Sequence, residues 1–148
     1  YNQINLTIID CLNEFMKPIN TKRVCHICNK TSQMMVKRSI FSASNILVFI
    51  FNRFNKQEEQ EMENIQFNYE EHLDLTNYIE NNRQELNINY VLIGVVSFLY
   101  SQNKFAAYCK NFLSNKWMCF VDENVFECNY NQIIAKGTPY LLFYKKFE

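Results

Sequence analysis

The stretch that decides the fold is Tyr90-Val-Leu-Ile-Gly-Val-Val-Ser-Phe-Leu-Tyr-Ser-Gln-Asn-Lys-Phe-Ala-Ala-Tyr-Cys-Lys-Asn111, followed by Lys116-Trp-Met-Cys-Phe-Val-Asp-Glu-Asn-Val125. Both stretches are rich in β-branched and aromatic residues, which are typical of strands. Working outward, we predict successive antiparallel strands at residues 87–99, 104–111, 116–121 and 139–146, with a helical turn at 132–136 before the last. An antiparallel sheet with few short helices predicts an α+β fold.

The first half of the chain predicts a helix, a ribbon and one more strand. Leu6, Ile9, Leu12 and Phe15 recur at a spacing of three and Pro18 follows, a pattern typical of an amphipathic helix of about three turns. We expect a knuckle-like turn at residues 25–28 and a long ribbon strand at 33–40. Residues 45–54 are dominated by β-branched and aromatic side chains and predict a buried strand. The charged residues 56–63 are expected to form a solvated hairpin tip.

Length and composition favour one domain over residues 1–148. With 48% hydrophobic residues, including 13 Phe and 9 Tyr, the chain can bury a core. The net charge of zero gives no reason to expect attraction to nucleic acid or to a membrane. No apolar run approaches the roughly 18 to 20 residues that span a bilayer, so we expect a soluble protein. Six cysteines in so apolar a chain indicate free intracellular thiols, cytoplasmic or nuclear.

Several motifs, in order along the chain, resemble the C-terminal half of the ubiquitin-specific protease domain, a papain-like cysteine peptidase. They are the helix motif Ile8 to Phe15, Arg53-Phe54 with Asn52 in place of a lysine, Leu73-Asp-Leu-Thr-Asn-Tyr78, the stretch 90–125, and the final strand Tyr140-Leu-Leu-Phe-Tyr-Lys145. The resemblance implies a helix and part of a fingers subdomain at about 1–64, and a palm subdomain at 65–148. Because the chain begins at Tyr1 without methionine, we expect it to be part of a longer protein.

The resemblance also implies that the catalytic residues are degenerate. The family's Gly-His-Tyr falls on Asn103-Lys104-Phe105, and its (Asp/Asn)-Asp pair falls on Val121-Asp122. A cysteine protease needs a thiolate, an imidazole and a polar group that orients the imidazole. A lysine, with an ordinary pKa near 10.4, would have to lose about three units to act as a base near neutral pH. We therefore predict no catalytic residues: Lys104, Val121 and Asp122 are degenerate family positions.

The remaining candidates are weaker. Asp122 is expected to be a turn residue that bonds its own backbone. His26, in the cysteine turn, and His72, in a predicted loop, are expected to lie far from the cleft. The remaining cysteines, Cys109 and Cys119 among them, are expected to pack in the core or on a half-exposed strand face. Phe105, Tyr108 and Trp117 are expected to take part in core or palm packing, since aromatics at alternating strand positions are usually half buried. Tyr100-Ser-Gln-Asn103 replaces the family's glycine slot, so the tail of ubiquitin should dock poorly.

Cys25 and Cys28 correspond to half of the family's four-cysteine zinc site. Tetrahedral zinc needs four ligands, so either the other pair precedes Tyr1, or the metal is lost and packing holds the turn. No other cofactor is expected.

Three functions stay open at this stage. The first is an inactive domain that serves as a structural or protein-interaction module in a larger assembly. The second is an active deubiquitinase whose cysteine comes from an upstream or partner segment. The third is a non-catalytic ubiquitin reader. The expected partners are proteins, with ubiquitin bound weakly at most, and neither nucleic acid nor membrane.

Overall fold

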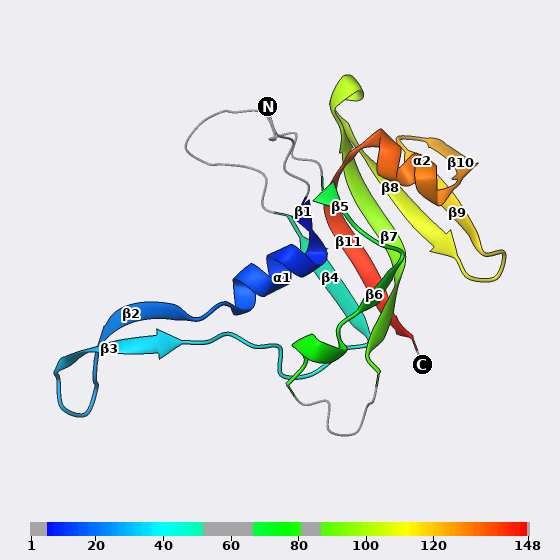
Figure 1. The fold of residues 1–148 in the computed structure, drawn as a ribbon. Helices are drawn as coiled ribbons and strands as arrows, with labels where there is room; N and C mark the ends of the chain where they lie inside the picture. The colour runs from blue at the N-terminus through cyan, green and yellow to red at the C-terminus, as the bar shows by residue number, and fades with distance from the viewer. Residues whose placement is uncertain (1–5, 52–66, 81–86, 148) are drawn as a thin grey trace.

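The computed structural model describes residues 6–51, 67–80 and 87–147. Figure 1 shows a twisted sheet whose near side carries two helices, α1 (Ile8–Met16) and α2 (Tyr130–Lys136), and a thin two-stranded hairpin that projects away from it. The predicted α+β fold with a mostly antiparallel sheet and few helices is confirmed.

The main sheet has the strand order β10-β9-β8-β7-β11-β4, and β6 pairs with the beginning of β7. Its strands are β4 (Ile46–Ile50), β6 (His72–Asp74), β7 (Asn89–Leu99), β8 (Lys104–Asn111), β9 (Lys116–Val121), β10 (Asn124–Cys128) and β11 (Thr138–Phe147). All their pairings are antiparallel. The four predicted strands are therefore confirmed within two residues at each end, whereas β10 was not predicted.

Local polar signals set where the helices begin. Thr7 caps α1, because its hydroxyl accepts a hydrogen bond from the Asp10 backbone N–H at 3.1 Å while the Asp10 carboxylate accepts one from the Thr7 N–H. The predicted helix therefore begins at Ile8, and β1 (Leu6–Thr7) pairs in parallel with β5 (Phe67–Asn68) instead. Asn129 caps α2 in the same way. Besides α1 and α2, the described residues contain two short 3-10 helices, η1 (Thr76–Tyr78) and η2 (Tyr100–Gln102).

The projecting hairpin consists of β2 (Ile19–Val24) and β3 (Thr31–Val36). The ribbon was predicted, but its second strand is displaced: it begins at Thr31 and ends at Val36 rather than spanning residues 33–40. Residues beyond Val36 leave the hairpin, and Ile40 forms an isolated parallel bridge with Ile79. The knuckle thus occupies the turn that joins β2 to β3, far from the main sheet (Figure 1).

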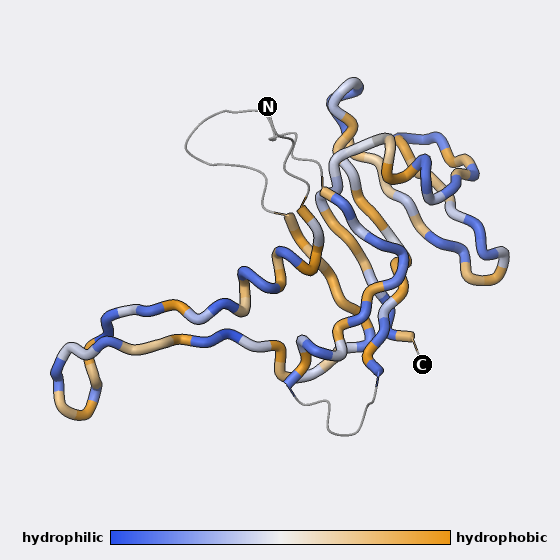
Figure 2. The backbone as a smooth tube through the Cα atoms, viewed as in Figure 1, coloured by the Kyte–Doolittle hydropathy of each residue, from blue (hydrophilic) through white to orange (hydrophobic). Residues whose placement is uncertain are grey.

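The core lies between the sheet and the elements on its near side. Residues of β7, β8 and β11 point into it, among them Leu92, Val95, Tyr108, Leu142 and Tyr144. Figure 2 shows the resulting hydrophobic colouring along β7 and β11. The prediction of a buried strand at 45–54 is wrong for β4. Within the described residues it pairs only with β11, and its Ile46, Val48 and Ile50 side chains are exposed. The motif at 52–54 and the charged residues 56–63 lie outside the described residues.

None of the described helices is long and apolar enough to cross a bilayer.

Candidate functional site

Lys104 is held at one end of the sheet by a tight connection from β7. The chain leaves β7 at Leu99, forms the turn η2, and passes through Asn103 in the left-handed conformation, with φ of 49°. Asparagine is among the residues that tolerate this conformation best. Lys104 then begins β8 in register with Leu99. The local fold therefore fixes the position of the Lys104 backbone.

Asp122 faces Lys104 from the turn that joins β9 to β10. Asp122 and Glu123 form this two-residue turn, in which Asp122 has φ of 52°. The Lys104 Nζ lies 2.6 Å from the Asp122 Oδ2, and the two side chains are 32% and 60% exposed. The prediction of a turn residue holds, but the Asp122 carboxylate binds the Lys104 ammonium rather than its own backbone. An ion pair this exposed adds at most about 1 kcal/mol to stability.

Val121 offers this pair no polar neighbour. It is the last residue of β9, half buried and packed against the core. Its isopropyl group neither donates nor accepts a hydrogen bond. A lysine ammonium has donors and no acceptor, so it cannot take a proton from a thiol. Lys104 and Asp122 thus form an ion pair, and Val121 adds an aliphatic side chain beside it. The three side chains do not form a base with an orienting group.

The two histidines lie elsewhere. His26 is exposed in the turn of the β2–β3 hairpin. His72 was expected in a loop, but it lies on β6, where backbone pairing with Val91 extends the sheet. Val91 is eight positions along β7 from Leu99, the partner of Lys104, which corresponds to roughly 26 Å at about 3.3 Å per residue. Neither imidazole can therefore serve at Lys104.

The strand cysteines also fit a structural role. Cys119 is buried opposite Tyr108, as expected of a core thiol, and Cys109 is exposed on β8. Cys109 lies five positions from Lys104, or roughly 16 Å along the strand. None of the six cysteines, all of which lie within the described residues, forms a disulfide.

A row of aromatic rings lies next to Lys104 and was not predicted. Phe98 contacts both Tyr100 and Phe105 at centroid distances of 5.1 Å, and Phe105 contacts Tyr140 at 5.5 Å. Phe105 is 43% exposed but packs on neighbouring palm strands, in agreement with the expected core or palm packing, and Tyr108 and Trp117 are buried. Phe98 and Phe105 are paired across β7 and β8, and this register is the signal that could have revealed the row.

The Cys25–Cys28 segment forms a hydrogen-bonded turn that carries two cysteines, half of the ligands that a four-cysteine zinc site needs. The Cys25 N–H donates to the Lys30 carbonyl at 2.9 Å, and the Asn29 N–H donates to the Cys25 carbonyl at the same distance. The backbone N–H groups of Cys28 and then Ile27 donate to the thiol and lower the pKa of Cys25, which favours the thiolate that metals bind. Within the described ranges no group of three or more His, Cys, Asp or Glu residues could hold a metal. The residues present therefore do not complete a four-ligand zinc site.

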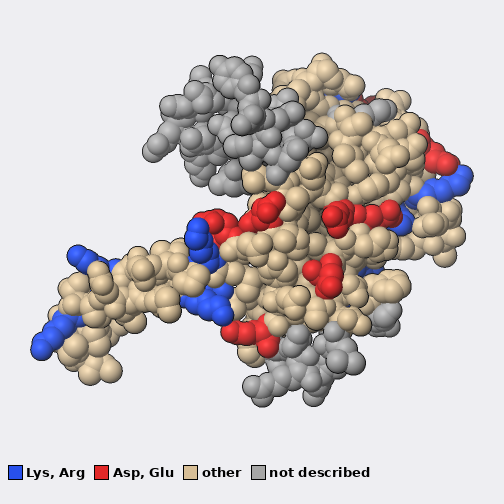
Figure 3. Space-filling model, viewed as in Figure 1, with Lys and Arg blue, Asp and Glu red and all other residues tan. Residues whose placement is uncertain are grey.

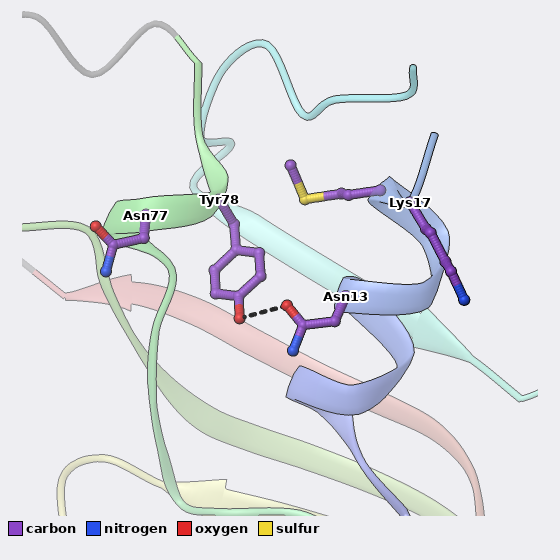
Figure 4. A pocket seen from close by; sticks show the side chains of 5 residues that line it. Asn13, Lys17, Asn77 and Tyr78 are labelled. Carbon is purple, nitrogen blue, oxygen red and sulfur yellow. Dashed lines mark hydrogen bonds between the residues drawn. The ribbon is translucent and has the colours of Figure 1, made fainter. Parts of the chain in front are cut away.

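One shallow depression, of about 380 Å³, lies between the end of α1 and η1 (Figure 4). It is lined by Asn13, Met16, Lys17, Asn77 and Tyr78, and the Tyr78 hydroxyl donates to the Asn13 Oδ1 at 3.0 Å. It holds neither a thiol nor an imidazole, so it offers no protease chemistry.

Comparison with known proteins places these features in a family. The model of the family described as ubiquitin carboxyl-terminal hydrolase matches residues 7–144. Ubiquitin carboxyl-terminal hydrolase 12 of Saccharomyces cerevisiae is 29% identical over 148 residues, covering 94% of this chain and 12% of that protein. Among solved structures, a variant SAGA Ubp8/Sgf11/Sus1/Sgf73 DUB module has a TM-score of 0.76 at 25% identity. The same module bound to ubiquitin aldehyde has a TM-score of 0.75 at 22% identity. Each of these two matches covers 100% of this chain and 36% of the matched chain.

Proposed function

Because the chain belongs to the ubiquitin carboxyl-terminal hydrolase family, whose members are deubiquitinases, we propose that it is a catalytically inactive member of that family. Its role is that of a structural or protein-interaction module in a larger assembly. The chain spans about an eighth of its relative from Saccharomyces cerevisiae and about a third of the matched structural chains, so this proposal concerns the longer protein of which it forms part.

The observation that carries the proposal is the Lys104–Asp122 ion pair. Proton transfer from a thiol needs an acceptor within hydrogen-bond reach and a group that fixes its orientation. Lys104 presents donors, and its carboxylate partner at 2.6 Å occupies them. Val121 leaves the orienting position without a polar atom. When the catalytic triad of a serine protease is removed, the enzyme keeps only roughly 10³ to 10⁴-fold acceleration over water. The oxyanion hole and substrate binding supply that remainder.

An interaction role is supported by what the structural relatives do. Ubp8 in the matched structures is assembled with Sgf11, Sus1 and Sgf73, so this fold can work as one subunit among several proteins. Six cysteines without a disulfide among them favour an intracellular compartment, cytoplasmic or nuclear. Partners of the present chain are proposed by chemical class in the next subsection.

Zinc is a further part of the proposal, with Cys25 and Cys28 as two of its ligands. The hydrogen-bonded turn presents both sulfurs from one loop, and soft thiolates are preferred zinc ligands. Two more ligands must then come from outside the described residues. Elemental analysis of the full-length protein tests this: bound zinc that is lost in a Cys25→Ser/Cys28→Ser variant supports it, and a metal-free, folded protein contradicts it.

The test of lost catalysis uses ubiquitin that carries a thiol-reactive electrophile at its C-terminus. We expect no covalent adduct with the full-length protein under conditions in which an active family member is labelled completely. Two variants give the matched comparison: Lys104→Ala at the site, and Lys116→Ala, which breaks the Lys116–Glu127 pair at the other end of the palm strands. Labelling of the wild type that Lys104→Ala reduces and Lys116→Ala spares would contradict the proposal.

Non-catalytic ubiquitin binding is the second candidate. It is favoured by one observation, that a relative of the same fold was solved with ubiquitin aldehyde bound. Against it, the resemblance aligns residues 100–103, which all carry side chains, with the family's glycine slot. Titration of the full-length protein with ubiquitin separates the two candidates: saturable binding at micromolar concentration favours the reader, and no binding favours the scaffold.

A further inference from the structure

Charge is strongly segregated in this neutral chain. The segment 17–38, which contains the β2–β3 hairpin, carries no acidic residue and six basic ones: Lys17, Lys22, Arg23, Lys30, Lys37 and Arg38. Since the whole chain has a net charge of zero, the hairpin segment at +6 is balanced by −6 elsewhere. In Figure 3 the hairpin shows blue patches and no red, whereas the red patches lie over the body of the molecule.

Most of these basic groups have no carboxylate to neutralise them. At the base of the hairpin, Lys17 pairs with Glu14 at 3.3 Å, and the Arg38 guanidinium lies over the Phe15 ring at 5.4 Å. Among the described residues, Lys22, Arg23, Lys30 and Lys37 form no ion pair, and all four are exposed. Uncompensated like charges held on one narrow hairpin repel one another, so binding of negative charge relieves that repulsion.

Aliphatic side chains are interspersed with these charges. Val24, Met34 and Met35 are exposed on the two strands, and Ile27 at the turn is 95% exposed. Figure 2 shows the alternation of hydrophilic and hydrophobic residues along the hairpin. Exposed apolar groups between like charges are a feature of protein interaction sites, and unbranched methionine adapts to varied partners.

The composition of the hairpin favours a protein partner over nucleic acid. Single-stranded nucleic acid is bound through aromatic rings that stack on bases, and residues 17–38 contain no Phe, Tyr or Trp. An acidic protein segment with aliphatic side chains would match both properties of the surface at once. Carboxylates would pair with the basic groups while the aliphatic side chains contact Val24, Ile27 and Met35.

We propose that the β2–β3 hairpin is the docking surface for an acidic, aliphatic protein segment. The inference rests on the proposed role as an interaction module, and it names the surface and the chemistry of the partner. A two-stranded hairpin is at best marginally stable alone, so a bound segment would also stabilise it.

The test measures fluorescence anisotropy of two labelled peptides with the full-length protein: one of glutamate and leucine, and one with glutamine in place of glutamate. We expect saturable binding of the glutamate peptide, weakened by added salt, and much weaker binding of the glutamine peptide. The variant Lys22→Gln/Arg23→Gln/Lys30→Gln should weaken binding roughly ten-fold, because each exposed ion pair contributes about 0.2–1 kcal/mol.

The matched control makes the same charge change away from the hairpin, in Asn87→Asp/Ser114→Glu/Asn131→Asp, three exposed positions. It should bind the glutamate peptide nearly as well as the wild type. Equal weakening of peptide binding in both variants would show that only the net charge of the protein matters, and would overturn the proposal. Tighter binding of a DNA duplex than of the glutamate peptide would also overturn it. The ubiquitin-electrophile assay is independent of these outcomes, so failure here leaves the proposal of lost catalysis standing.

Discussion

The centre of the main sheet and the projecting hairpin are both antiparallel β-structure, yet they are built from opposite kinds of sequence. In β7 the buried residues are Tyr90, Leu92 and Gly94 and then, after a shift of one residue, Val95, Ser97 and Leu99. Leu142 and Tyr144 of β11 pack into the same core. In β2 five of six residues are exposed. The sheet strands are therefore largely buried, and the hairpin strands are largely exposed.

The difference has a functional consequence. A buried strand tolerates few substitutions, because close packing penalises any change of volume. An exposed hairpin is free of that constraint, and the segment 17–38 that contains it carries six basic residues and no acidic one. The site at Lys104 lies between these extremes, since its backbone is fixed by the sheet while its side chain reaches the surface.

The largest expected effect separates these two regions. Leu142→Ala removes a fully buried side chain from β11, and we expect a loss of about 2–5 kcal/mol in the free energy of unfolding. Met35→Ala, on the exposed hairpin, should change it by less than about 0.5 kcal/mol. Urea denaturation of both variants measures the contrast. Equal losses would mean that the hairpin is packed as tightly as the sheet.

The two glycines provide a second contrast. A Cβ at Gly137 would lie 2.9 Å from the Ser97 Cβ and 3.1 Å from the Phe98 carbonyl, whereas a Cβ at Gly94 would meet its nearest atoms at 3.5 Å. We expect Gly137→Ala to destabilise by about 1–3 kcal/mol through overpacking. Gly94→Ala should be far milder. Thermal unfolding of the pair measures this, and the reverse order would show that α2 does not approach β7 so closely.

A buried hydroxyl gives a smaller effect. The Tyr144 hydroxyl donates to the Glu70 carbonyl at 2.6 Å in the core, and Tyr144→Phe leaves that carbonyl without its donor. The expected loss is about 1 kcal/mol. Tyr78→Phe is the control, because its hydroxyl bonds to the Asn13 side chain at an exposed position and should matter less. The two values follow from urea midpoints, and a larger loss at Tyr78 would contradict the assignment of the core.

The smallest expected effect is the loss, at acid pH, of the contribution that ionised Asp74 makes to the free energy of unfolding. The Thr76 hydroxyl and then the Thr76 N–H donate to the Asp74 carboxylate and lower its pKa. A lowered pKa in the folded state contributes stability that is present above the unfolded value, near 3.9, and is lost as pH falls through the folded value. Asp74→Asn should therefore flatten the dependence of the urea midpoint on pH in this acidic range. An unchanged acid dependence would rule out this contribution.

Sequence patterns predicted the elements whose side chains follow a clear period. The strands of residues 87–121 and the helix ending at Met16 were found because burial and period coincide there. Strand β10 was missed because four of its five residues are exposed. For β4, a continuous apolar run could not distinguish a strand buried on both faces from one that is half exposed.

The candidate site was predictable only in part, for a physical reason. The family motif identified Lys104, Val121 and Asp122, but their contact depends on the left-handed turns that bring residues 18 positions apart to 2.6 Å. The basic hairpin segment was not predicted from composition, because its excess of basic residues is cancelled by acidic residues elsewhere in the chain. The distribution of charge along the chain therefore carries information that the total does not.

The most direct measurement of the central claim is hydrolysis of a ubiquitin C-terminal fluorophore conjugate by the full-length protein, with and without prior alkylation of its thiols. If an ammonium paired with Asp122 stands where the base is required, the signal should stay at the buffer rate in both samples. Turnover well above buffer that alkylation abolishes and Lys104→Ala lowers would contradict the account.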